Sequence, residues 1–119
     1  MFRFEKLEVW QKAVEYADLV YKVTRTFPVE ERFGLTSQLR RSAVSVSSNI
    51  AEGSSRSSDT DLARFIEIAY GSLLESVSEL EIANRQQFLN DVMFKTIYKN
   101  AEDLAKMLSG FRRTVKKGS

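Results

Sequence analysis

The sequence contains neither cysteine nor histidine, and this double absence limits the chemistry open to it. Without histidine there is no imidazole base, no Ser-His-Asp triad and no histidine-ligated metal. Without cysteine there is no disulfide, no thiol nucleophile and no thiolate zinc site. We therefore expect the protein not to be an enzyme, and to hold no cofactor and no metal.

Long apolar runs and an excess of one charge are also missing. No segment approaches the roughly 20 apolar residues that span a bilayer. The first residues alternate apolar and charged side chains, unlike a signal peptide. These features predict a cytoplasmic protein without a membrane partner. The 18 Lys and Arg and the 16 Asp and Glu leave a net charge of +2, which indicates no class of partner.

Helix breakers are scarce, with one proline and five glycines in 119 residues. Between them, apolar residues recur at spacings of three and four, which is typical of amphipathic helices. The predicted helices cover residues 5–26, 35–53, 59–84 and 90–116. In the last three, the side expected to face the core consists of Leu39, Ser42, Val46 and Ile50, then Leu62, Ile66, Ala69, Leu73, Ser76, Leu80 and Ala83, then Phe94, Ile97, Ala101, Leu104, Leu108, Phe111 and Val115. Because the connections are short, we expect one all-α domain over residues 1–119, an antiparallel up-down-up-down four-helix bundle.

The first predicted helix carries two apolar stripes. One repeats at heptad spacing and is expected to face the core; it consists of Trp10, Val14, Ala17, Tyr21 and Thr24. The other lies about 100–140° away on a helical wheel, and it consists of Val9, Tyr16, Val20 and Val23. We interpret this second stripe, together with Ile68 of the third helix, as an interface between copies of the chain. The alternative is scattered surface apolar residues, which are common.

Basic residues gather on one side of the fourth predicted helix, within about 40° by helical geometry. They are Lys95, Lys99, Lys106, Arg113 and Lys117, and Arg40 and Arg56 add charge from the second helix and its loop. Such a stripe is suited to contact the phosphates of nucleic acid. The alternative is a solvated helix face in which pairs such as Lys99 with Asp103 balance each other.

Carboxylates are the candidate acids and bases that remain. Glu75 and Glu79 lie one turn apart on the third predicted helix, and Glu52 lies near the end of the second, which also carries Arg41. We predict that these four residues form a structural or interfacial ion-pair network, because carboxylates with perturbed surroundings are often structural. The alternative is a metal-dependent nuclease that uses the three glutamates.

Four segments together resemble a known family. They cover residues 4–13 (FEKLEVWQKA), 27–41 (FPVEERFGLTSQLRR), 45–53 (SVSSNIAEG) and 65–73 (FIEIAYGSL). Over roughly residues 2–115 the chain resembles the four-helix-bundle proteins encoded by intervening sequences in bacterial 23S ribosomal RNA genes. The accessory variability protein of diversity-generating retroelements shares the fold of that family.

The resemblance implies a closed homo-oligomer, a pentameric barrel of bundles. The retroelement relative binds nucleic acid and its reverse transcriptase through basic surface residues. We therefore expect a non-enzymatic homo-oligomer that binds RNA or DNA, or a partner such as a reverse transcriptase or another nucleic-acid enzyme. The alternative is a structural or protein-interaction scaffold without affinity for nucleic acid.

Overall fold

The computed structural model describes the backbone of residues 1–118 and the side chains of residues 1–116. It contains four long helices, α1 (Glu8–Thr24), α2 (Leu35–Ser54), α3 (Asp59–Arg85) and α4 (Asp91–Gly118). Two short 3-10 segments, η1 (Arg3–Lys6) and η2 (Val29–Glu31), precede α1 and α2. The described residues include no strand, so the predicted all-α, four-helix fold is confirmed.

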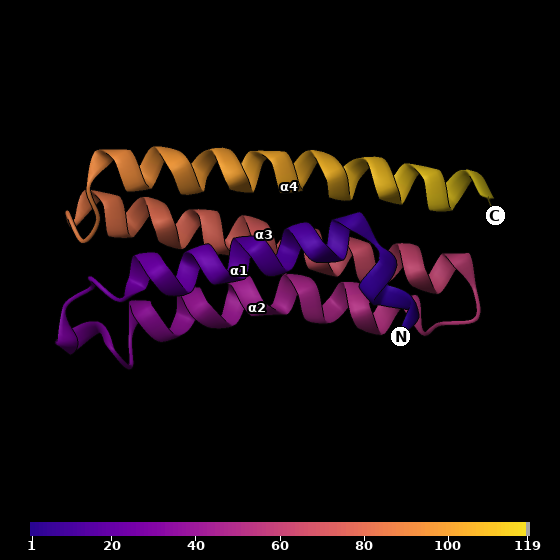
Figure 1. Ribbon diagram of the computed structural model, residues 1–119, viewed down its shortest axis with the longest axis horizontal. Helices are drawn as coiled ribbons and strands as arrows, with labels where there is room; N and C mark the ends of the chain where they lie inside the picture. Colours follow the sequence, from indigo (N-terminus) through magenta and orange to yellow (C-terminus); the bar gives the residue numbers. More distant parts are fainter. Residues whose placement is uncertain (119) are drawn as a thin grey trace.

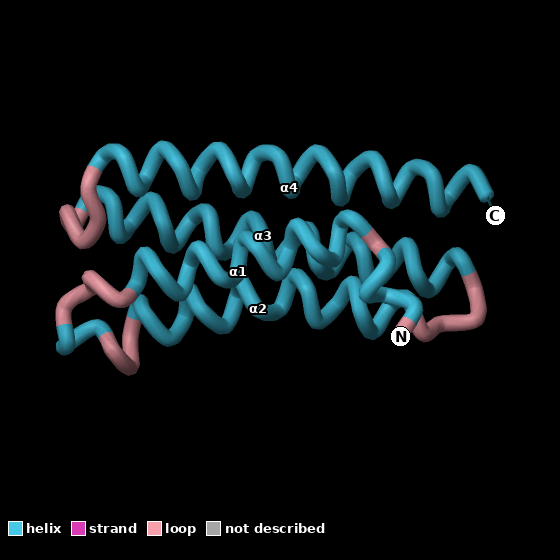
Figure 2. The backbone as a smooth tube through the Cα atoms, viewed as in Figure 1, coloured by secondary structure: helices cyan, strands magenta, loops and turns pink. Residues whose placement is uncertain are grey.

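The helices lie side by side along a body of 45 × 23 × 22 Å (Figure 1). α1 and α3 each pack against α2 and α4, while the backbones of the diagonal pairs lie farther apart. The α1–α2 and α3–α4 connections lie at one end, on the left in Figure 2, and the α2–α3 connection lies at the other. The two connections on the left touch, because the Phe27 and Phe88 ring centroids are 5.5 Å apart.

Side-chain caps begin two of the helices. Ser58 Oγ accepts from the Asp61 N–H at 3.1 Å ahead of α3, and Asn90 Oδ1 accepts from the Met93 N–H at 2.8 Å ahead of α4. These bonds satisfy N–H groups that the first turn of a helix leaves without an intrahelical partner. Both N-caps are therefore fixed by a side chain next to the helix in the sequence.

α1 begins at Glu8 rather than near Glu5. The reason is Leu7, whose extended backbone (φ −81°, ψ 122°) separates α1 from η1. This break lets the chain fold back, so that the Phe4 ring of η1 packs edge-on against Trp10 with 4.9 Å between the ring centroids. Trp10 thus lies between the N-terminal segment and the core, and it is only half-buried.

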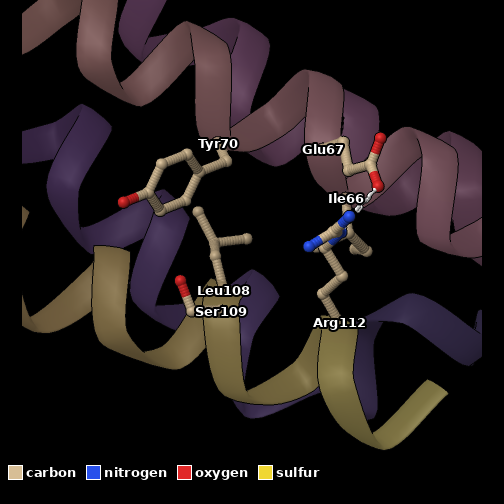
Figure 3. Close-up of a pocket in the computed structure, with 6 residues that line it drawn as sticks. All are labelled: Ile66, Glu67, Tyr70, Leu108, Ser109 and Arg112. Atoms are coloured by element: carbon tan, nitrogen blue, oxygen red, sulfur yellow. Dashed lines mark hydrogen bonds and ion pairs between the residues drawn. The ribbon is translucent and has the colours of Figure 1, made fainter. Parts of the chain in front are cut away.

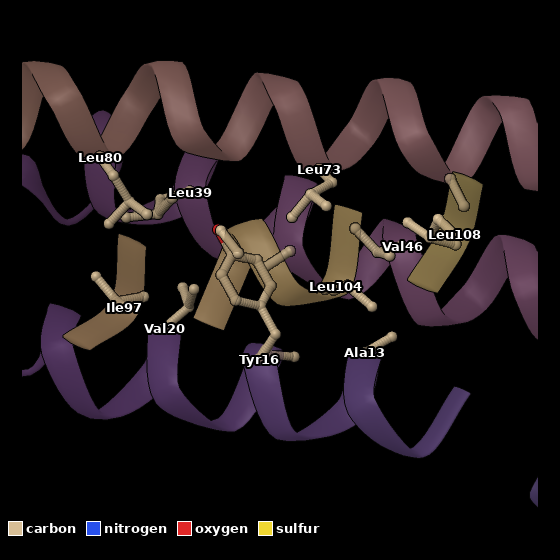
Figure 4. Packing of buried hydrophobic residues seen from close by; sticks show 14 of the residues in the cluster. Ala13, Tyr16, Val20, Leu39, Val46, Leu73, Leu80, Ile97, Leu104 and Leu108 are labelled. Atoms are coloured by element: carbon tan, nitrogen blue, oxygen red, sulfur yellow. The ribbon is translucent and has the colours of Figure 1, made fainter. Parts of the chain in front are cut away.

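The four helices share one hydrophobic core (Figure 4). Most of the core positions predicted for the last three helices are confirmed as buried, whereas Phe94, Phe111 and Val115 of α4 are half-buried and pack against the core. Apolar side chains at heptad spacing from all four helices meet along the bundle axis, which removes them from water and supplies the main driving force for folding.

The interface predicted on α1 is wrong, because its four residues lie inside the protomer. Tyr16 and Val20 are fully buried, and Val9 and Val23 are 5% and 2% exposed. In Figure 4 the Tyr16 ring points from α1 into the interior of the bundle. Of the predicted interface residues, Ile68 alone stays on the surface, with 46% of its area exposed.

The stripe expected to face the core is peripheral in part. Tyr21 is 40% exposed, and Trp10 and Val14 are half-buried, whereas Ala17 and Thr24 are buried. Both stripes of α1 have heptad spacing, so periodicity predicts a helix correctly without indicating which stripe the other helices cover.

At Gly53, α2 lies too close to α3 to leave room for a side chain. A Cβ atom at this position would lie 2.7 Å from Phe65 Cβ and 3.2 Å from Leu62 Cδ1. The first distance is shorter than real carbon contacts, so the glycine is required by packing. Gly71 on α3 provides a contrast, since a Cβ atom there would meet nothing within 4 Å.

We predict opposite effects of alanine at these two glycines. Gly71→Ala should raise the free energy of unfolding by about 0.5–1 kcal/mol, because alanine favours helix more than glycine does. Gly53→Ala should lower it by about 1–2 kcal/mol, because overpacking outweighs that gain. Denaturant unfolding at matched protein concentration measures both. A stabilised Gly53→Ala variant would contradict the close packing of α2 on α3.

Candidate nucleic-acid interface

The outward side of α4 carries four of the cations that the sequence predicts, namely Lys95, Lys99, Lys106 and Arg113, and all four are exposed. Lys99 Nζ lies 3.0 Å from Asp103 Oδ1, and this hydrogen bond raises the pKa of Lys99 and lowers that of Asp103. The other three make no ion pair within the described side chains. The side chain of Lys117 lies outside the described residues.

A pocket of about 320 Å³ opens between α3 and α4 beside this side of the helix (Figure 3). Arg112 of α4 crosses it, and its Nε donates to Glu67 Oε1 of α3 at 2.7 Å. Lys116 Nζ lies 3.7 Å from the same oxygen. The hydrogen bond from Arg112 is the main cause that lowers the pKa of Glu67. Arg112 and Lys116 thus share one carboxylate, and Glu67 compensates one of their two positive charges.

A shallower pocket beside it is lined by two of the predicted cations, Lys106 and Arg113, together with Tyr70, Ala105 and Ser109. Tyr70 and Ser109 border both pockets. A ligand with negative charge would therefore meet two cations without carboxylate partners at this end of α4. The pairing of Arg112 with Glu67 joins residues far apart in the chain, and the sequence offers no signal for it.

The predicted cations of α2 lie elsewhere, because α4 packs against α1 and α3 and not against α2. Arg40 and Arg41 line a groove between α1 and α2. Arg56 already has two partners in its own chain. Its Nη2 lies 3.1 Å from Glu52 Oε1, and its guanidinium carbon lies 4.7 Å from the Phe65 ring centroid. The predicted cations therefore form separate groups on different sides of the bundle.

The predicted network of Arg41, Glu52, Glu75 and Glu79 does not form within the described chain. Glu52 pairs with Arg56, while Arg41 and Glu75 are exposed and have no ion-pair partner among the described residues. The physical reason is that Arg41 is exposed and lines the groove between α1 and α2.

Glu79 takes part in a buried polar layer instead. It is 7% exposed, and its Oε1 accepts a hydrogen bond from Ser42 Oγ at 2.7 Å. Burial is the largest cause that raises the pKa of its carboxyl, and the nearby charge of Glu75 raises it further. In the same region Tyr16 Oη and Ser76 Oγ are 2.7 Å apart, and burial raises the pKa of Tyr16 to about 12. Hydroxyls thus connect α3 to both α1 and α2.

The described residues form neither a metal site nor a membrane-spanning helix. No group of three or more acidic side chains among them is arranged to hold a metal ion. None of the helices, as far as they are described, combines the length and the apolar character needed to cross a membrane. The three glutamates of the nuclease hypothesis therefore do not form a metal cluster.

Comparison with known proteins identifies the family. The model of the 23S rRNA-intervening sequence protein family matches residues 5–110. The chain belongs to this family. Its fold is similar to the crystal structure of a protein of unknown function from the S23 ribosomal protein family of Bacteroides thetaiotaomicron, with a TM-score of 0.81 and 23% identity over 87% of this chain and 97% of that one. No curated protein matches the chain.

We predict that Glu79→Gln stabilises the protein at neutral pH. Because folding raises the pKa of Glu79 above its ordinary value of 4.5, its carboxyl favours the folded state below that pH, and this contribution is lost as the pH rises through the raised pKa. The glutamine keeps an oxygen to accept from Ser42 and carries no charge. Its melting temperature should exceed that of the wild type at pH 7 and match it near pH 3.

Glu75→Gln is the matched control, one turn away on the exposed side of α3. It removes the smaller cause of the raised pKa, so its gain should have the same sign and be smaller. Equal melting temperatures of the Glu79→Gln variant and the wild type at pH 7 would mean that this carboxylate is not destabilised by burial.

Proposed function

We propose that this protein is an antiparallel up-down-up-down bundle that assembles into a closed homo-oligomer, a pentamer, and that the assembly binds RNA or DNA without catalysing a reaction. Membership of the 23S rRNA-intervening sequence protein family supports a role near RNA, since the family is named after an insertion in ribosomal RNA. The lack of histidine and cysteine supports a binding role rather than a catalytic one.

One observation carries the nucleic-acid part of the proposal. Lys95, Lys106 and Arg113 project from one side of α4, all exposed and none of them in a close ion pair among the described side chains, although the charge of Lys106 helps to lower the pKa of Asp103. Cations in such a line can contact successive phosphates and release the counterions condensed on the nucleic acid. Surface cations that their own carboxylates already neutralise would contribute less.

The assembly needs an apolar surface that one protomer leaves uncovered, and α3 offers it. Ile68, Leu74 and Ile82 are 46%, 51% and 50% exposed. Ile68 and Ile82 are two heptads apart and therefore lie on the same side of the helix. Large exposed aliphatic side chains gathered on one helix are typical of a contact surface between proteins.

A scaffold without affinity for nucleic acid is the alternative function. The observation that favours it is that Arg56, Lys99, Arg112 and Lys116 all form ion pairs with carboxylates of the same chain, Arg112 and Lys116 with the same one. In that case the basic residues serve solubility, and the functional surface is one that binds another protein, such as a reverse transcriptase or another nucleic-acid enzyme.

Binding to structured ribosomal RNA over a salt series tests the nucleic-acid part. We expect a steep dependence of the binding constant on salt, and the Lys95→Gln/Lys106→Gln/Arg113→Gln variant should lower the log–log slope by about 2, since each phosphate contact adds about 0.7–0.9. Lys22→Gln, on the exposed side of α1, is the control for charge. No binding at about 50 mM salt, where screening is weak, would favour the scaffold.

Solution mass tests the assembly. We expect Ile68→Glu/Ile82→Glu to reduce the mass measured by light scattering to that of a 13.6 kDa monomer, because two buried charges at an apolar contact are costly. Helical circular dichroism should not change, as both residues are exposed in the protomer. Val92→Glu, at an exposed position of α4, is the control. A double variant with unchanged mass would exclude α3 as the contact surface.

A further inference from the structure

A groove between α1 and α2 combines three arginines with two aromatic side chains. It is an open hollow of about 480 Å³, and its lining includes Tyr21 of α1, Arg40 and Arg41 of α2, and Arg32 and Phe33 of the connection between the helices. No carboxylate is among its lining residues. Glu31, the acidic neighbour of Arg32, uses its Oε1 to accept from the Leu35 N–H at 3.1 Å.

Arg40 is held in one geometry by two contacts. Its Nε donates to Thr24 Oγ1 at 2.8 Å, and Thr24 Oγ1 in turn donates to the Val20 carbonyl at 2.8 Å. Its guanidinium carbon lies 4.6 Å from the centroid of the Tyr21 ring. Within the described chain both terminal Nη groups are left without a hydrogen-bond partner. A fixed guanidinium with two free amino groups is suited to bind phosphate with two parallel hydrogen bonds.

Phe33 is the unusual residue of this groove. It is 88% exposed although it is aromatic, and it contributes nothing to the hydrophobic core. The guanidinium carbon of Arg32 lies 5.4 Å from its ring centroid. An aromatic ring on the surface beside arginines is the arrangement by which proteins hold unpaired nucleotides, because every base can stack on a ring while the phosphates contact the cations.

The arginines of this groove differ from four cations on the other basic surfaces. Arg56, Lys99, Arg112 and Lys116 all contact carboxylates of the same chain. Arg32, Arg40 and Arg41 contact none among the described residues. The groove therefore concentrates uncompensated positive charge beside two aromatic rings, and a polyanion with flat aromatic groups complements both features.

We infer that this groove binds an unpaired stretch of polynucleotide, with a base stacked on Phe33 and phosphates bound by Arg32 and Arg40. The inference rests on the nucleic-acid binding proposed above and assigns it a second site, distinct from α4. RNA and DNA share the chemistry that the groove recognises, namely a flexible chain of bases and phosphates.

Fluorescence anisotropy with labelled oligouridylate and oligothymidylate of about ten nucleotides tests the groove, with an RNA duplex as a third probe. We expect Phe33→Ala to weaken binding of the single strands by about tenfold. Phe33→Leu, which keeps an apolar side chain and removes the ring, should weaken it similarly, and Phe33→Trp should preserve it. Because Phe33 is exposed, none of these changes should alter the melting temperature.

The charges are tested in the same experiment. Arg32→Gln/Arg40→Gln should weaken single-strand binding and flatten its salt dependence, whereas Lys22→Gln/Arg25→Gln, which removes equal charge from exposed positions of the first helix and its end, should have a smaller effect. Single-strand binding that is insensitive to the Phe33 and arginine variants would overturn the inference. So would binding of the duplex alone, although the proposed function would then stand. If no probe binds, the proposed function fails as well.

Discussion

The close approach of α2 and α3 is the constraint on which the rest of the bundle depends. Distances between packed helices are set by the side chains at the contact. Here α2 contributes small residues: Gly53 lies against Phe65 of α3, and the Ser45 hydroxyl lies 2.9 Å from that of Ser72. With α3 held against one side of α2, the other side of α2 meets α1. That arrangement places Arg40 against Tyr21 and leaves Arg41 at the surface.

The same packing decides which cations are free. Arg112 of α4 reaches Glu67 of α3 because the two helices are neighbours, so a pair distant in sequence becomes an ion pair. Arg40 faces no carboxylate because α1 offers it a ring and a hydroxyl instead. Charge counted along the sequence therefore overestimates the basic surface of α4 and underestimates that of the α1–α2 groove. The proposed nucleic-acid binding depends on this distribution rather than on the net charge.

Much of the fold could be predicted from the sequence, because it depends on patterns among residues that are close together in the chain. The heptad spacing of α2, α3 and α4 predicts these helices and their buried sides. The side-chain caps at Ser58 and Asn90 lie where α3 and α4 begin. The buried side of α1 is harder to predict, since two apolar stripes have the same spacing. Which stripe is buried depends on where the other helices pack, and they cover Tyr16. The groove was missed for a similar reason: the Tyr21 ring meets Arg40 only after α1 and α2 pair. One signal was present, an aromatic residue directly after Arg32 in the connection between the two helices.

Ultraviolet cross-linking of the protein to oligouridylate, followed by mass spectrometry of tryptic peptides, tests the central claim most directly. Cleavage after Arg32 and Arg40 releases residues 33–40 as one peptide with Phe33 at its start. We predict that this peptide carries the uridine adduct, because a stacked base lies in contact with the ring. Adducts confined to peptides of α4 would contradict the assignment of unpaired nucleotides to the α1–α2 groove.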